Sequence, residues 1–170
     1  GIIGVTSLSD IQDHILSSLT RLEYRGYDSS GIATISNNKL NFCKSEGKIK
    51  NLSEKLINSP IRGSIGIGHT RWATHGSVSE INAHPHIAGN VAIVHNGIIE
   101  NYDPIKKFLR SKKVKFKSET DTEVLVQLIG YFFNKGKLNF EQSVRAALQR
   151  VDGAYGIVVL NKKEPDVMIA

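Results

Sequence analysis

The first five residues, Gly1-Ile2-Ile3-Gly4-Val5 (GIIGV), are small or apolar and predict a β-strand at the start of the sequence. Apolar residues then recur at helical spacing over residues 11–22. Two further extended segments, 31–36 and 40–44, flank Asn37-Asn38 and predict a hairpin. Strands joined by a tight turn, with helices between them, indicate an α+β fold of mainly antiparallel sheets covered by helices.

The remaining elements extend the same pattern along the sequence. Helices are predicted over residues 49–57, 98–111, 121–132 and 140–151, and strands over 64–69, 91–95, 154–160 and 167–170. Thr120 and Glu123 match a capping box at the start of one helix. A length of 170 residues suits one domain. Because the sequence ends inside a predicted strand, we expect part of the domain to lie beyond residue 170.

The composition is that of an ordinary globular protein, with 40% hydrophobic and 22% charged residues. No apolar run approaches the ~20 residues of a membrane span, so no membrane partner is predicted. A single cysteine, Cys43, cannot form an internal disulfide, which predicts a cytoplasmic protein. Cys43 lies in a strand-like run without glycine or histidine at useful spacing, so its predicted role is that of a small buried hydrophobe.

The net charge of +6 includes a basic run from Arg110 to Lys117 with five positive charges. Such a run could serve a nucleic-acid-binding protein, but no recognition motif accompanies it. The alternation of Val114 and Phe116 with lysines predicts instead an edge strand with one wet face. Nucleic acid is therefore not a predicted partner, and it remains the alternative from a different functional class.

Three stretches are more polar than their setting, and the first is GHTRWATHG, residues 68–76. It leaves a predicted buried strand and enters a loop. Arg71 offers a planar fork of donors that suits a carboxylate or a phosphate. Thr74 and His75 add hydrogen-bonding groups, and Trp72 could cap a pocket. The alternative is a surface loop with an arginine salt bridge and a packed tryptophan.

The second and third polar stretches add two more kinds of group. Asn96 and Gly97 place a side-chain amide beside a backbone N–H, which suits an oxyanion hole, although a plain Asn-Gly turn is the alternative. Asp121, at a predicted helix start, could hold an ammonium group or cap the helix. The sequence therefore predicts a carboxylate clamp and an oxyanion hole without an attacking group.

Six histidines raise the question of a metal site. His84 and His86 have a spacing that some metal sites use, and His69 and His75 are nearby in the sequence. No cysteine or carboxylate cluster completes the set, so no metal is predicted. Polar and packing roles around a cleft are favoured instead.

Five motifs together resemble one family. They are RLEYRGYDSSG (21–31), GHTRWATHG (68–76), NAHPH (82–86), HNGIIEN (95–101) and SETDTE (118–123). In this order they resemble the glutaminase domain of the glutamine–fructose-6-phosphate aminotransferase family, which makes glucosamine 6-phosphate. The resemblance runs from residue 1 to residue 170, and the first motif separates it from the related amidophosphoribosyltransferases and asparagine synthetases.

The resemblance implies a fold and a nucleophile. The fold is a four-layer αββα sandwich of the N-terminal nucleophile hydrolase type, with an incomplete glutaminase domain over 1–170 and the sugar-isomerase half absent. Family members carry a cysteine where the residue immediately before Gly1 would stand, and this cysteine is not in the sequence. Its thiol would attack the side-chain amide of glutamine, and its free α-amine would move protons near neutral pH.

The resemblance also implies substrate contacts at Arg71, Trp72, Thr74, His75 and Asp121, and an oxyanion hole at Asn96 and Gly97. Arg71 would bind the α-carboxylate of L-glutamine, and Asp121 would bind its α-ammonium group. No cofactor is expected. The products would be glutamate and ammonia, and the ammonia would pass to the protein's own sugar-isomerase domain in a full-length homo-oligomer. Without the cysteine, the alternative is a catalytically silent glutamine-binding chain.

Overall fold

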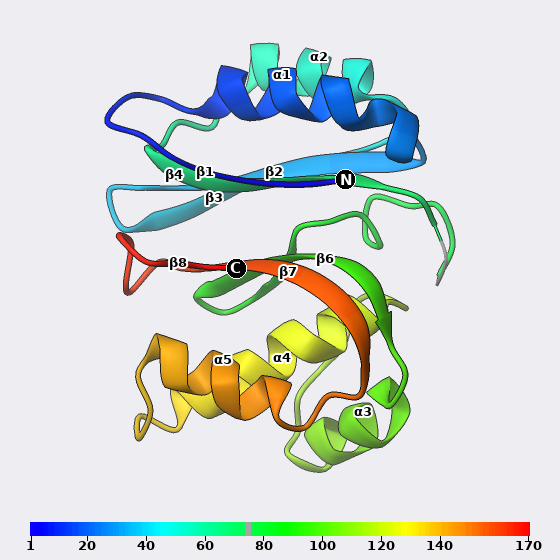
Figure 1. Ribbon diagram of the computed structural model, residues 1–170, viewed down its shortest axis with the longest axis vertical. Helices are drawn as coiled ribbons and strands as arrows, with labels where there is room; N and C mark the ends of the chain where they lie inside the picture. The colour runs from blue at the N-terminus through cyan, green and yellow to red at the C-terminus, as the bar shows by residue number, and fades with distance from the viewer. Residues whose placement is uncertain (74–75) are drawn as a thin grey trace.

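The computed structural model describes residues 1–73 and 76–170, which form four layers (Figure 1). Two sheets face each other at the centre. Helices α1 (Gln12–Leu22) and α2 (Ile49–Asn58) cover the outer face of one sheet, and α3 (Tyr102–Ser111), α4 (Asp121–Asn134) and α5 (Phe140–Leu148) cover the other. The predicted αββα sandwich is confirmed. None of the helices described is long and apolar enough to cross a membrane.

The first sheet contains β1 (Ile2–Thr6), β2 (Ser29–Ser36), β3 (Lys39–Glu46) and β4 (Ile65–Arg71) in the antiparallel order β1-β4-β2-β3. Asn37 and Asn38 both have positive φ, 50° and 58°, and form the predicted hairpin turn between β2 and β3. Ile2 pairs with His69, so the start of the chain lies beside the end of β4.

The second sheet contains β5 (His86–Ala88), β6 (Val91–Ile99), β7 (Gly153–Asn161) and β8 (Met168–Ile169), in that order and antiparallel. The prediction that a helix begins at Ile98 is wrong, because β6 continues to Ile99 and α3 begins at Tyr102. Ile98 is 44% exposed while Ile99 is buried, as expected for alternating strand residues. Pairing with β7, which the local pattern does not reveal, extends the strand.

The edge strand predicted within the basic run is also wrong. Residues 114–117 form no strand, and the main-chain N–H of Lys117 donates to the Glu123 carboxylate at 2.9 Å. Val114 and Phe116 pack against the apolar core below the second sheet. The guanidinium of Arg110 lies over the Phe116 ring, 5.9 Å from its centroid. The alternation therefore reflects a packed connection between two helices.

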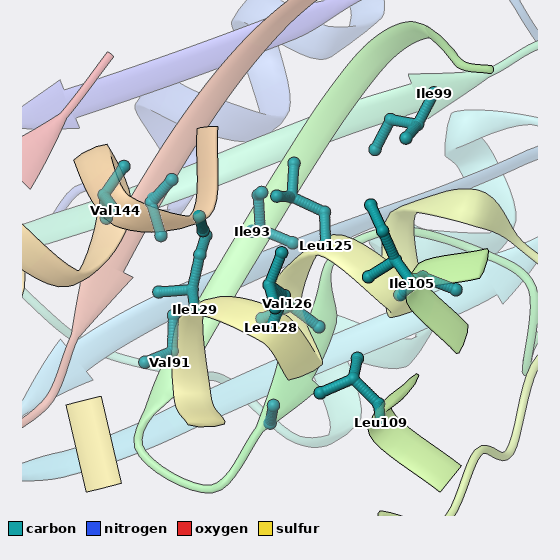
Figure 2. Packing of buried hydrophobic residues seen from close by; sticks show 14 of the residues in the cluster. Val91, Ile93, Ile99, Ile105, Leu109, Leu125, Val126, Leu128, Ile129 and Val144 are labelled. Carbon is teal, nitrogen blue, oxygen red and sulfur yellow. The ribbon is translucent and has the colours of Figure 1, made fainter. Parts of the chain in front are cut away.

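Three apolar clusters hold the layers together. One lies between the first sheet and α1 and α2, and includes Ile15, Leu19, Ile32, Leu52 and Leu56. A second joins the two sheets and includes Ala33, Ile35, Ile65, Ile67, Ala92, Val94, Val158 and Leu160. The third joins β6 and β7 to α3, α4 and α5, and Figure 2 shows Ile93, Leu125, Ile129, Ile105 and Val144 converging in it. Cys43 packs at the edge of the first cluster but is only partly buried, whereas a buried position was predicted.

Candidate active site

A cavity of about 340 Å³ opens where residues from both sheets and the start of α4 meet. It brings together Gly1, Arg25, His69, Thr70, Arg71, Trp72, His84, His95, Asn96, Gly97, Ile98, Thr120, Asp121 and Thr122. Five of the predicted site residues, Arg71, Trp72, Asn96, Gly97 and Asp121, are therefore in one place. The other two, Thr74 and His75, lie outside the described residues.

The cavity begins where one face of β4 and one face of β6 pass from apolar to polar residues. On β4, Ile65 and Ile67 belong to the inter-sheet cluster, and the next residues of the same face are His69 and Arg71. Successive residues on one face of a strand are two positions apart. On β6, Asn96 likewise follows Val94. The alternation of side chains along each strand therefore places apolar residues between the sheets and polar residues at the end of this layer.

Arg71 is buried at the end of β4. Its guanidinium donates to the main-chain carbonyls of Ser77 at 3.2 Å and Gly76 at 3.4 Å. Burial lowers its pKa, and the carboxylates of Asp28 and Asp121 oppose this shift. Arginine is not deprotonated in proteins, so the group is a desolvated cation.

Trp72 forms the rim of the cavity. Its side chain is 60% exposed and meets the Tyr27 ring edge-on, with the centroids 5.9 Å apart. The following residue, Ala73, donates its N–H to the Asp28 carboxylate at 2.8 Å, and the Asp28 N–H donates to the Arg71 carbonyl at 3.1 Å. The motif at residues 21–31 therefore braces the segment that follows β4.

Asn96 and Gly97 lie within β6, so the alternative of an Asn-Gly turn is wrong. Both are exposed to the cavity. Gly97 has φ 118°, and a Cβ there would lie 2.1 Å from the Ala154 carbonyl oxygen of β7. Only glycine suits this backbone and this close approach. The amide side chain and the neighbouring backbone are thereby presented together at the cavity wall.

Asp121 is the first residue of α4, and its buried carboxylate connects two elements. It accepts from the Ile99 N–H at 2.9 Å and from the Thr122 N–H at 2.8 Å, so it ties β6 to the helix start. Thr120 caps α4 by accepting from the Glu123 N–H at 3.2 Å, as predicted. The second hydrogen bond of the predicted capping box, from the Thr120 N–H to the Glu123 carboxylate, is not formed. That carboxylate accepts instead from the main-chain N–H groups of residues 117 and 118.

Gly1 stands at the cavity wall beside the last residues of β4. Its nitrogen donates to the Thr70 carbonyl oxygen at 2.7 Å and to the Thr70 hydroxyl at 2.9 Å, and its carbonyl accepts from the Thr70 N–H. Sequence reasoning did not assign Thr70, Arg25 or Thr122 to the site. All three lie within the motifs of the resemblance, but only the pairing of β1 with β4 brings Gly1 to Thr70.

Four buried histidines, His69, His84, His86 and His95, form a cluster, and all except His86 line the cavity. The rings of His69 and His84 stack with centroids 4.1 Å apart, and His86 meets His84 edge-on at 4.9 Å. Burial lowers the pKa of His69 to about 3 and lowers those of the other three. Within the described part of the chain, no group of three or more metal-ligating side chains could hold a metal ion.

Comparison with known proteins identifies the class. A family profile described as a glutamine amidotransferase domain matches residues 69–170, more than half of the sequence. The chain therefore belongs to the glutamine amidotransferase domain family.

Within this family the match to one kind of protein covers the whole chain. It is 45% identical over 172 aligned residues to the glutamine–fructose-6-phosphate aminotransferase (isomerizing) of Clostridium acetobutylicum, and 48% identical over 170 residues to that of Bartonella quintana. All of the chain is aligned in both cases, and it spans 28% of each relative. The predicted resemblance to the glutaminase domain is confirmed.

Solved structures agree with the fold. The glutamine phosphoribosylpyrophosphate amidotransferase of B. subtilis, complexed with ADP and GMP, superposes with a TM-score of 0.81 at 26% identity. The similarity covers 95% of this chain and 35% of that one. A glutamine aminotransferase class-II domain protein from Silicibacter pomeroyi, at 13% identity and a TM-score of 0.64, shares the fold.

Proposed function

We propose that this chain is the glutaminase part of a glutamine–fructose-6-phosphate aminotransferase, and that it binds free L-glutamine and releases glutamate and ammonia. One observation carries the proposal. A buried cation, a buried carboxylate and an amide donor, on Arg71, Asp121 and Asn96, line the same cavity as the start of the first strand. Its volume of about 340 Å³ is within the range of small-molecule sites.

The two charged groups account for recognition of a free amino acid. Arg71 binds the α-carboxylate and Asp121 binds the α-ammonium group, with Trp72 over the bound substrate. Thr74 and His75 contribute further hydrogen bonds to the carboxylate in this proposal. A glutamine within a peptide has neither charge, and each buried charge left unpaired costs about 2–5 kcal/mol. The site therefore selects glutamine with both ends free.

The chemistry uses a cysteine immediately before Gly1. Its thiolate attacks the side-chain amide carbon, and the carbonyl π electrons move to oxygen, where Asn96 and Gly97 donate hydrogen bonds to the oxyanion. When the carbonyl re-forms, the C–N bond breaks and ammonia leaves with a proton from the α-ammonium group of the cysteine. Water then attacks the thioester in the same way, which releases glutamate and restores the thiol.

The surroundings of Gly1 support a base near neutral pH. With Gly1 as the first residue, burial and then the charge of Arg25 lower the pKa of its amino group to about 6. An α-amine one residue earlier would enter the same cavity, so we expect its pKa to fall below the ordinary 7.7–8.0. A lowered pKa would increase the unprotonated fraction of this amine near neutral pH, which is the form that accepts the thiol proton.

The remaining part of the proposal concerns the whole protein. Ammonia passes to a sugar-isomerase domain of the same protein, which uses it to convert fructose 6-phosphate to glucosamine 6-phosphate. The full-length protein is a homo-oligomer in this proposal. Its location is cytoplasmic in this proposal.

Glutamate release by the full-length protein tests the proposal. Intact mass first establishes whether a cysteine with a free amine precedes Gly1. L-Glutamine should then be hydrolysed, while N-acetyl-L-glutamine and the α-amide of L-glutamine should react at least tenfold more slowly because each lacks one charged end. Binding of glutamine by calorimetry without glutamate release would favour the silent glutamine-binding alternative. A protein that neither binds glutamine nor releases glutamate would contradict the proposal.

A further inference from the structure

His69 joins the two sheets through a side-chain hydrogen bond at the floor of the cavity. It lies on β4, two residues before Arg71, and is 3% exposed. Its Nε2 lies 2.9 Å from the Oδ1 of Asn96, which is on β6 in the opposite sheet. Asn96, the proposed oxyanion donor, is therefore hydrogen-bonded to His69, a residue that has no part in the proposed reaction steps.

The direction of this hydrogen bond fixes the direction of the amide. An amide oxygen only accepts, so the His69 Nε2 must carry the proton. The NH₂ group of Asn96 then points away from His69, and Asn96 lines the cavity. Burial lowers the pKa of His69 to about 3, so the ring is neutral with one proton. Among the described residues the other ring nitrogen, Nδ1, is buried without a hydrogen-bond partner, so Asn96 Oδ1 is the acceptor for the ring proton.

Neighbouring groups restrain the His69 ring itself. It stacks on the His84 ring, with the centroids 4.1 Å apart and the planes at 17°. The Nδ1 of His84 lies 3.3 Å from the main-chain N–H of His95 and accepts from it. His95 directly precedes Asn96, so the stacked pair contacts the Asn96 segment through both a side chain and the main chain.

We propose that His69 is a positioning residue: its Nε2–H holds the Asn96 amide with the NH₂ group turned into the cavity. The inference rests on the proposed function, in which that NH₂ group meets the oxyanion. A rotated amide would place its oxygen there and repel the developing negative charge. Loss of His69 should therefore resemble loss of the Asn96 donor, which by analogy with other oxyanion holes lowers turnover about 10²–10³-fold.

A double-mutant cycle in the full-length protein tests the proposal. His69→Leu should lower kcat about 100-fold with KM changed less than threefold, and in an Asn96→Ala background it should cause little further loss. His69→Gln can place an amide nitrogen near the Nε2 position, so it should remain within about tenfold of the parent. Equal losses from His69→Leu in both backgrounds would overturn the proposal. So would a folded His69→Gln protein as inactive as His69→Leu, with thermal unfolding reporting the fold of each.

The tautomer of His69 gives a second test that does not depend on activity. Nitrogen-15 NMR of the full-length protein, assigned by comparison with His69→Gln, should show the proton on Nε2 at pH 7. A proton on Nδ1 would overturn the proposal even if the enzyme is active. If the parent protein releases no glutamate, the proposed function fails, and the tautomer alone decides whether His69 orients Asn96.

Discussion

The two ends of the layer between the sheets differ sharply although the same strands build both. At one end Ile67 of β4 and Val94 of β6 are fully buried among apolar neighbours. Two residues further along the same faces stand His69 and Asn96, which contact each other by a hydrogen bond instead. The apolar end gains stability from removing surface from water, whereas the polar end must satisfy each buried group with a partner.

This difference separates what stabilises the fold from what recognises a ligand. Changes at the apolar end should alter the free energy of unfolding and leave the cavity groups in place. Changes at the polar end should alter binding or turnover, and the buried histidines there should make stability depend on pH. The four predictions below test this separation.

Acid should have the largest effect, because the buried histidines are at the polar end. Their pKa values in the folded protein are lowered by burial, against about 6.5 when unfolded. Above pH 6.5 these histidines are mostly neutral in both states. As the pH falls below 6.5, the unfolded state binds protons that the folded state does not, so the free energy of unfolding decreases. For His69, whose pKa in the folded protein is about 3, the cost should be about 1.4 kcal/mol per pH unit between pH 6 and pH 4.

Urea unfolding of the chain at pH 7, 6 and 5 measures this loss. The control is His14→Gln, which changes an exposed residue of α1 and should leave the pH dependence unaltered. A free energy of unfolding that is the same at pH 7 and pH 5 would contradict the buried, neutral state of the cluster.

Ile67→Ala should destabilise the apolar end by about 2–5 kcal/mol, because it leaves a cavity between the sheets. The loss should be equal at pH 7 and pH 6, and ligand binding by the folded fraction should be unchanged. Ile57→Ala on α2, where the side chain is 77% exposed, is the control and should change stability by less than about 0.5 kcal/mol. Equal destabilisation by the two substitutions would show that the layer is not packed as described.

Asn96→Ala in the full-length protein should lower turnover of glutamine about 10²–10³-fold, since one donor to the oxyanion is removed. It should also lower the free energy of unfolding by about 1–3 kcal/mol, because the buried His69 Nε2–H loses its acceptor. Steady-state glutamate release measures the first quantity. A change in turnover smaller than threefold would count against the oxyanion role.

Arg71→Lys should have the smallest of the four effects, a weakening of glutamine binding by about tenfold, since lysine keeps the charge but loses the planar fork. Calorimetric titration with L-glutamine measures it. Arg110→Lys, at an exposed position on α3, is the matched control and should bind like the parent. Affinity unchanged in the Arg71→Lys protein would remove Arg71 from the carboxylate site.

Local patterns predicted most of the elements because each depends on its own residues. Periodicity identified α1, α2, α4 and α5, and the Asn37-Asn38 turn fixed the hairpin of β2 and β3. The wrong predictions lie where a residue distant in the sequence determines the local structure. Ile98 stands at helical spacing from Tyr102 but pairs with β7, and Lys117 donates to a carboxylate on α4.

The candidate site could be predicted only where its residues are recognisable from the local sequence. Arg71, Asn96 and Asp121 have chemistry that is evident from residue type and motif. The role proposed for His69 depends on a contact between the two sheets, and no spacing within the sequence reveals that contact. Pairing of the first strand with β4, which brings Gly1 to Thr70, is likewise a property of the fold.

The most direct test of the account is a crystal structure of the full-length protein with L-glutamate bound. We expect the α-carboxylate at Arg71, the α-ammonium group at Asp121 and the side-chain carboxyl facing Asn96 and Gly97. Glutamate bound elsewhere, for example in the second cavity beside Lys44 and Glu80, or with its amino group away from Asp121, would contradict the account.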